Sequence, residues 1–174
     1  MDGDAVWYEA AHVVGITNAL NVVADGLTDA RALGATIGPA DESRVPSEAA
    51  EIFAEIRTFY ARPDVPTAFW LLASDPGYLG DVWGATRRAF SDNQLARRLK
   101  EALAFAVSLT TRSGFGTAFH LGEMRRLGVG ECGVMEILGV TQMFSSYTKI
   151  ADTLQLDPDM GDIAPVDPSP PPSP

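Results

Sequence analysis

The 174-residue sequence predicts an all-α protein, and three observations carry this prediction. Apolar residues recur at three-and-four spacing along most of the chain, which is the period of one face of a helix. Clusters of glycine and proline divide these stretches into separate segments. No segment shows the alternation of apolar and polar residues that is typical of a half-buried strand. Because 46% of the residues are hydrophobic, the chain is expected to bury a core without disulfides or metal.

The first half of the chain is predicted to hold four helices. Segment 34–46 contains two glycines and two prolines without an apolar period, so we expect a loop there. Ser47 follows this loop and is the type of residue that caps the N-terminus of a helix. The sequence Asp75-Pro76-Gly77 is typical of a turn. The expected helices cover residues 5–27, 47–60, 67–73 and 78–90.

The second half is predicted to hold three further helices and a tail. The first of these helices has the most regular apolar face in the sequence. Gly128 is expected to cap the C-terminus of the second helix. Seven of the last seventeen residues are proline, so residues 158–174 are expected to be extended and disordered. The expected helices cover residues 93–109, 115–127 and 133–154.

A partial internal repeat links the opening helix to the closing helix. Residues 8–27 align without gaps on residues 135–154, with five identities in twenty positions. The chain therefore opens with a helix that resembles its own closing helix. We expect this opening helix to need another subunit to cover its apolar face. The predicted organisation is an opening helix at 1–33, a linker at 34–47, a helical domain at 48–157 and the tail at 158–174.

Charge and hydropathy exclude several kinds of partner. The formal net charge is −10, and the excess of acidic residues lies at the two ends of the chain. Acidic ends repel phosphate groups, so no nucleic-acid partner is expected. No apolar run is long enough to cross a bilayer, and the start of the chain lacks the basic residues of a signal peptide. We therefore expect a cytoplasmic protein that does not bind membranes.

The cysteine and histidine content limits the chemistry of the chain. Cys132 is the single cysteine, which excludes an intramolecular disulfide and a multi-cysteine zinc site. We expect this thiol to be partly buried and inert. His12 and His120 are the two histidines, too few to suggest a metal site, and no cofactor is implied.

One segment combines residues that could perform acid–base chemistry. Glu101 lies on one predicted helix and His120 on the next, so the two side chains can meet across the helix pair. A carboxylate that orients an imidazole makes it a general base near neutral pH. Ser113 lies at the start of the second helix, where backbone N–H groups favour an anion. A histidine between two helices is also often a hydrogen-bonded core residue, which leaves a purely structural role open.

Aromatic residues are expected to fill the core and to wall a pocket. Phe115 and Phe119 are spaced by one helical turn around the candidate segment, so we expect them to border an apolar pocket. The aromatic residues expected in the core are Trp7, Phe69, Trp70, Tyr78, Trp83 and Phe105.

Several stretches resemble the carboxymuconolactone decarboxylase and AhpD-like alkylhydroperoxidase superfamily. They include Glu101-Ala-Leu-Ala-Phe-Ala-Val-Ser, Thr-Ala-Phe-His120 and the helix that ends at Leu154. The resemblance covers residues 48–157, with 5–27 as a partial second copy. It implies an AhpD-like helical bundle and an oligomer. In the AhpD-like motif, a Glu precedes Cys-x-x-Cys-x-x-x-His; the two thiols reduce hydroperoxides, and the Glu and His relay protons.

The chain departs from this motif at both cysteines. Glu101 and His120 match the acid and the histidine, whereas the thiol positions fall on Ser113 and Gly116. Neither a hydroxyl nor a hydrogen can cycle between a thiolate and a disulfide. Disulfide-based peroxidase chemistry is therefore not expected at this site.

Two functional interpretations follow from the resemblance and its departure. The first is a non-peroxidatic family member, a pseudoenzyme or a structural subunit, which forms a homo-oligomer or binds a sister subunit that supplies a missing repeat half. The second is a cofactor-independent lyase or isomerase, similar to the decarboxylase branch, that acts on a small carboxylated molecule. In this second interpretation His120 is the acid or base and Glu101 orients it. Ser113 and Arg112 would hold the substrate carboxylate, and the guanidinium would favour the charge of an enolate.

Overall fold

The structure is a computed structural model that describes residues 3–156, and this part of the chain is helical without strands. The prediction of an all-α fold is confirmed. The predicted tail at 158–174 lies outside the described residues. None of the helices within 3–156 combines the length and the hydropathy needed to cross a membrane. The elements are α1 (Gly3–Ala32), the 3-10 helix η1 (Glu42–Arg44), α2 (Ser47–Tyr60), α3 (Thr67–Leu72), α4 (Pro76–Phe90), α5 (Arg97–Thr111), α6 (Gly114–Arg126) and α7 (Glu131–Leu154).

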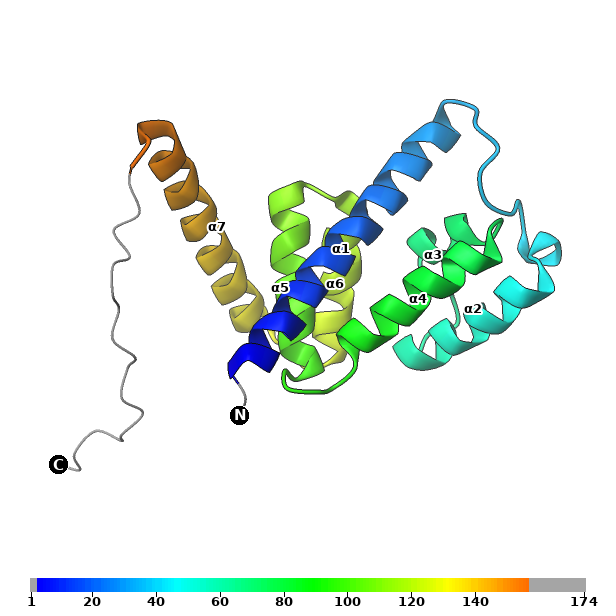
Figure 1. Cartoon of the computed structure of the whole chain (residues 1–174), viewed down its shortest axis with the longest axis horizontal. Helices are drawn as coiled ribbons and strands as arrows, with labels where there is room; N and C mark the ends of the chain where they lie inside the picture. The colour runs from blue at the N-terminus through cyan, green and yellow to red at the C-terminus, as the bar shows by residue number, and fades with distance from the viewer. Residues whose placement is uncertain (1–2, 157–174) are drawn as a thin grey trace.

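The long helix α1 lies across the other helices and contacts α3, α4, α5 and α6 (Figure 1). On one side of α1, helices α2, α3 and α4 form a layer. Helices α5 and α6 form a hairpin that carries the candidate residues. Helix α7 packs on α5 near its own beginning and then projects away from the rest of the molecule (Figure 1).

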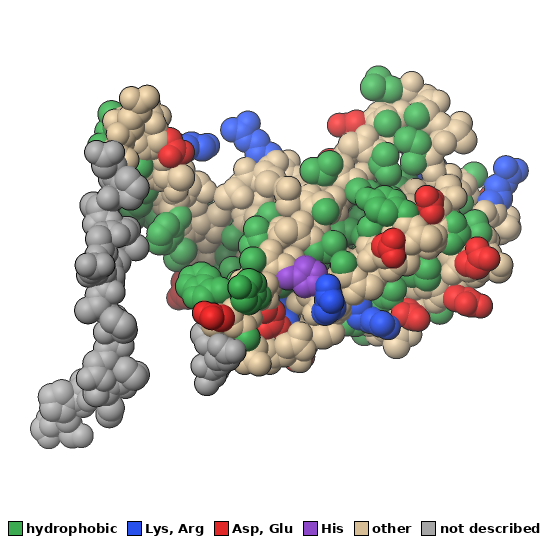
Figure 2. Space-filling model, in the orientation of Figure 1, with side chains coloured by type: hydrophobic (Ala, Val, Ile, Leu, Met, Phe, Trp, Pro, Cys, Tyr) green, Lys and Arg blue, Asp and Glu red, His purple; other side chains and the backbone are tan. Residues whose placement is uncertain are grey.

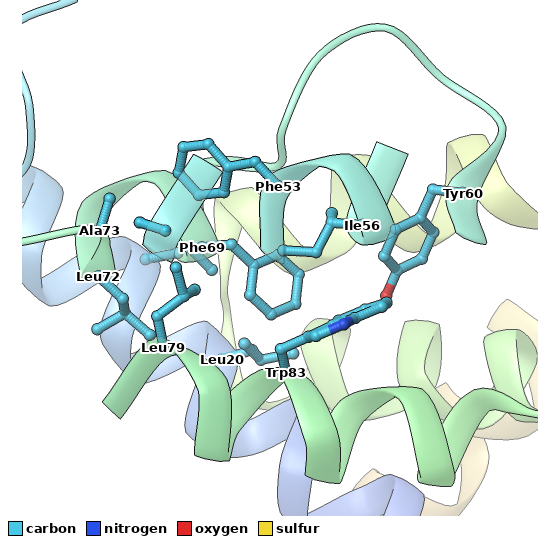
Figure 3. Packing of buried hydrophobic residues seen from close by; sticks show 12 residues of the cluster. Leu20, Phe53, Ile56, Tyr60, Phe69, Leu72, Ala73, Leu79 and Trp83 are labelled. Atoms are coloured by element: carbon cyan, nitrogen blue, oxygen red, sulfur yellow. The ribbon is translucent and has the colours of Figure 1, made fainter. Parts of the chain in front are cut away.

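The largest core cluster fills the space between α1 and the layer of α2, α3 and α4. In Figure 3, aromatic and aliphatic side chains from these four helices point toward one another. Trp83 is central, because its indole ring packs edge-on against Phe59 and Phe69 at centroid distances of 5.3 and 5.7 Å. Its indole N–H donates to Glu55 at 2.9 Å, which satisfies the polar atom of a largely buried ring.

Three helix boundaries differ from the predictions for local reasons. Ser47 is the first residue of α2 and not its cap; Pro46 occupies the capping position without a side-chain hydrogen bond. The predicted turn at Asp75 is the beginning of α4, because the Asp75 carboxylate accepts from the Tyr78 N–H at 3.0 Å and Pro76 needs no hydrogen-bond acceptor at the first helical position. Helix α6 ends one residue earlier than predicted: Leu127 is its C-cap residue, and Gly128, with φ of 83°, follows the cap.

Helix α5 begins four residues later than predicted because side chains hold the preceding segment in a non-helical conformation. Glu9 of α1 accepts hydrogen bonds from the backbone N–H groups of Gln94 and Leu95, both at 3.0 Å. Asp92 accepts from the N–H of Arg97 at 2.6 Å. The apolar period seen in the sequence therefore continues upstream of the helix itself.

Three predicted burial states are wrong. Trp7 is 77% exposed on the first turn of α1, and Tyr78 is 49% exposed on α4. Cys132, expected to be partly buried, is exposed in the first turn of α7. Periodicity alone misplaces these residues, because a residue that fits the apolar period is exposed wherever no other helix packs against it.

The two ends of the helical region differ in how they pack. The apolar face of α1 is covered by its own chain, with Val13, Leu20 and Ala24 fully buried. The cover expected from another subunit is therefore not needed at α1. Helix α7 has one buried residue among its described positions, Val134. The helix that lacks cover is the closing one.

Candidate functional site

The hairpin of α5 and α6 brings Glu101 and His120 into direct contact. The imidazole Nδ1 lies 2.8 Å from the Glu101 Oε2, and both side chains are almost completely buried. Glu101 is on the face of α5 that packs on α6, and His120 is on the facing turn of α6. Because an ionised carboxylate can only accept, Nδ1 carries the proton in this pair. The Nε2 atom is then the basic nitrogen of a neutral ring.

Arg97 completes a buried charge network around this pair. Its Nε lies 3.2 Å from Glu101 Oε1, and a terminal nitrogen lies 3.3 Å from Glu123 Oε2. Arg126 binds the same Glu123 carboxylate at 2.7 Å, and this hydrogen bond, together with the Glu123 charge, raises the pKa of its guanidinium. Two carboxylates are thus matched by two guanidiniums. The two guanidiniums therefore balance the two carboxylates within the core, as buried charges require.

Aromatic rings position both the guanidinium and the imidazole. The Arg97 guanidinium lies over the rings of Phe59 and Tyr60, at 4.1 and 5.0 Å from their centroids. Burial, followed by the charge of Glu101, raises the pKa of the Tyr60 phenol far above its ordinary value, so the phenol stays protonated.

The imidazole of His120 is held between two phenylalanine rings. It stacks on Phe90 at 5.7 Å with an interplanar angle of 13°. The ring of Phe119 packs edge-on against it at 5.1 Å. Phe115 reaches this group through Phe119, on which it stacks at 5.7 Å. Of the two aromatic residues predicted to border the site, Phe119 contacts the imidazole and Phe115 supports Phe119.

Ser113 and Gly116 form the beginning of α6. Ser113 is the N-cap residue, and its hydroxyl accepts from the Gly116 N–H at 3.0 Å. Gly116 is buried, and there is no room for a side chain on it. An added Cβ would overlap the Oδ1 of Asn21 and the Oγ of Ser108, and would lie 2.9 Å from the Asn21 Cγ. Asn21 therefore fills the space into which a side chain at position 116 would project.

Two hydroxyl groups of α5 hold this side chain of α1 in place. The Asn21 amide donates to the hydroxyl of Ser108 at 3.1 Å and to that of Thr111 at 3.3 Å. One turn later, the Asp25 carboxylate accepts from the Phe115 N–H at 3.4 Å, at the positive end of α6. A cavity of about 300 Å³ lies between α1 and the beginning of α6. Its lining residues are Asn18, Asn21, Val22, Asp25, Gly26, Thr111 and Ser113.

Arg112 lies at a different place from the buried network. It ends α5 in the left-handed conformation, with φ of 60°, and it lines a groove between α5 and α7. The guanidinium that contacts Glu101 belongs to Arg97 and not to Arg112. The sequence does not single out Arg97 as a site residue. Its position four residues before Glu101 is the signal that could have found it, since residues four apart share a helix face. Asn21 offered no such signal, because 87 residues separate it from Ser108.

Among residues 3–156, no group of three or more His, Cys, Asp or Glu side chains is arranged so that it could hold a metal ion.

The arrangement of these helices defines the chain as having the AhpD fold. A solved structure that shares it is the alkylhydroperoxidase AhpD core from Rhodospirillum rubrum ATCC 11170, with a TM-score of 0.68 and 20% sequence identity. The similarity covers 72% of this chain and 95% of that one. No protein-family model matches the sequence, and no curated protein matches it. The predicted AhpD-like helical bundle is thereby confirmed at the level of the fold.

Proposed function

We propose that this chain is a member of the carboxymuconolactone decarboxylase and AhpD-like superfamily that does not reduce hydroperoxides. It is a cytoplasmic pseudoenzyme or structural subunit. The observation that carries the proposal is the beginning of α6, where Ser113 caps the helix and Asn21 fills the space beside Gly116. Reduction of a hydroperoxide by a dithiol oxidises two thiols to a disulfide, and the chain has one cysteine.

Cys132 does not offer a replacement for the missing thiols. It is exposed in the first turn of α7, outside the Glu101–His120 network. A thiol at this position has no second thiol in the chain with which to form a disulfide.

The test is hydroperoxide consumption by the wild-type protein with a dithiol reductant. We expect no turnover above that of the Cys132→Ser variant, because a serine at 132 removes the one sulfur that could react with peroxide. Dithiol-dependent turnover by the wild type that disappears in Cys132→Ser would overturn the proposal. Turnover that persists in Cys132→Ser would overturn it as well, since it would require peroxide chemistry without a thiol.

A second candidate function rests on the Glu101–His120 pair. The Glu101 carboxylate accepts from Nδ1 of the imidazole, which leaves Nε2 as its basic nitrogen, and Arg97 pairs with the same carboxylate. Such a pair is suited to moving a proton to or from a carbon atom next to a carbonyl group, without a cofactor. The reaction class is that of a lyase or isomerase on a small carboxylated molecule, for which Ser113 at the beginning of α6 would hold the carboxylate. Arg112, expected from the sequence to share this role, lines the groove between α5 and α7 instead.

Malonate is a suitable probe for this second function. If the hairpin binds small carboxylates, millimolar malonate shifts the imidazole resonances of His120, and Ser113→Ala weakens the effect. Ser47→Ala, a substitution at the exposed first residue of α2, serves as the control and leaves the effect unchanged. Unshifted His120 resonances at saturating malonate would contradict the second function and favour the structural role.

A further inference from the structure

Helix α7 carries an exposed apolar stripe that runs along more than half of its length. The stripe consists of Val140, Met143, Tyr147, Ile150 and Leu154, which are 51% to 63% exposed. Their spacing of three and four residues places all five on one face of the helix. In Figure 2 the arm formed by α7 stands apart from the rest of the molecule, with hydrophobic side chains at its surface. A face of this kind on a folded protein marks an interaction surface.

The first helix contains the same stripe in a buried form. In the register of the internal repeat, the α7 residues correspond to Val13, Ile16, Leu20, Val23 and Leu27 of α1. Val13 and Leu20 are fully buried, and the other three pack against the core clusters. In α1 the stripe is therefore covered by other helices of its own chain. The matching stripe of α7 lacks such cover within the described residues.

We propose that the α7 stripe binds the α7 stripe of a second copy of this chain, with the two helices antiparallel. A two-fold axis near residue 145 places Val140 of each copy opposite Ile150 of the other and Met143 opposite Tyr147. One interface then covers both stripes, as a self-complementary contact requires. Within the described residues the stripe has no such cover on its own chain, since all five of its side chains are more than half exposed.

The charge at one end of the stripe determines the direction of the pairing. The same face of α7 continues before Val140 with Glu136, an exposed acidic residue four positions earlier. A parallel pair would place the two Glu136 carboxylates side by side, which is unfavourable. In the antiparallel pair each Glu136 lies at the Leu154 end of the other helix. Between these two positions the stripe holds no charged residue.

The area of this contact predicts a weak, reversible dimer. A large apolar side chain exposes roughly 60–120 Å² when free, so ten half-exposed side chains offer roughly 500 Å² of apolar surface. Because homodimer interfaces are about two-thirds apolar, the total is about 750 Å², below the ~1,000 Å² of a stable specific interface. A contact of this size is typical of a weak, reversible association.

Sedimentation of the full chain across micromolar concentrations tests whether the dimer forms. We expect a concentration-dependent dimer for the wild type. Met143→Glu and Tyr147→Glu each weaken it by at least about 100-fold, because each buries two carboxylates in an apolar seam. Gln142→Glu adds the same charge to the opposite side of α7 and leaves dimerisation unchanged. Because the substituted side chains are exposed, circular dichroism shows that the variants stay folded.

Cysteine cross-linking in the Cys132→Ser background tests the direction. Mixing Val140→Cys chains with Ile150→Cys chains gives the mixed disulfide dimer, whereas either variant alone gives little cross-linked product, since identical positions lie too far apart. Cross-linking of Val140→Cys with itself would show a parallel pair and overturn the proposal. A wild-type chain that stays monomeric would overturn the proposal too. The stripe would then be covered by a different subunit or by the chain's own C-terminal segment, and either outcome contradicts pairing with a second copy.

Discussion

Arg97 is the residue that makes a buried Glu101–His120 pair physically acceptable. A carboxylate in the core is costly unless it is both paired and hydrogen-bonded. The guanidinium of Arg97 contacts Glu101 and Glu123 at once and rests on two aromatic rings. Spacing in the sequence predicts the acid and the histidine, but the resemblance to known motifs does not include this arginine. Its role emerges only when α5 and α6 are packed together.

Removal of the Arg97 guanidinium should therefore be strongly destabilising. In Arg97→Gln, Glu101 and Glu123 each lose a cation, and we expect the free energy of unfolding to fall by about 3–5 kcal/mol. Arg87→Gln is the matched control, because Arg87 forms an ion pair with Glu55 in which both side chains are more than half exposed. That change should cost less than about 1 kcal/mol. Urea denaturation measures both; equal losses would contradict the proposed role of Arg97.

Gly116 and Asn21 should show energetic coupling. Gly116→Ala introduces a methyl group into space held by Asn21 and should cost about 1–3 kcal/mol. Adding Asn21→Ala removes the Asn21 part of the obstruction and leaves the Ser108 hydroxyl, so the double variant should be more stable than the sum of the single effects predicts. Gly122→Ala, at a position of α6 where an added Cβ meets no atom within 4 Å, is the control and should stabilise by about 0.5–1 kcal/mol. Additive effects in the double-mutant cycle would show that Asn21 does not fill this space.

At the scale of elements, α1 is held by polar anchors that periodicity could not predict. The Glu9 carboxylate binds the fully buried Lys100 ammonium and the N–H groups before α5. Apolar spacing identified the helix and the side that packs. It did not show that the helix packs on its own chain, because the anchoring contacts join residues far apart in the sequence. The same limit applies to Asn21, whose partner is on α5.

The anchor at Glu9 should make stability depend on pH. Burial raises the pKa of the Glu9 carboxyl, but the hydrogen bonds from Lys100 and from two backbone N–H groups outweigh burial and leave it below its ordinary value of 4.5. A pKa that is lower in the folded state stabilises the protein at neutral pH, and this contribution is lost as the pH falls below about 4.

Stability of Glu9→Gln measured between pH 7 and pH 3 tests this anchor. The variant should be less stable than the wild type at pH 7, and the difference should narrow on acidification. Glu51→Gln, at an exposed position of α2, should show a much smaller difference at every pH. A Glu9→Gln deficit that stays constant down to pH 3 would show that the Glu9 charge does not anchor α1.

For the whole molecule, the sequence predicts the fold class and the relation between the two end helices more reliably than it predicts what covers them. The internal repeat relates the two end helices, but the prediction that the opening helix lacks cover is wrong, because the uncovered apolar face is on α7. Helix α1 is covered since it packs against α3, α4, α5 and α6, and its Asn21 fills the space beside Gly116. These contacts join residues far apart in the sequence, so spacing alone could not predict them.

The most direct test of the account returns the two thiols to the beginning of α6. Hydroperoxide turnover with a dithiol reductant is compared for Ser113→Cys/Gly116→Cys and for the same variant with Asn21→Ala and Ser108→Ala, which remove both side chains that obstruct position 116; both variants are in the Cys132→Ser background. We predict that the double thiol variant is inactive or poorly folded, because a side chain at 116 overlaps Asn21. The variant that also lacks the Asn21 amide should gain turnover supported by Glu101 and His120. Equal turnover by both variants, or a silent but folded variant with the space opened, would contradict the account.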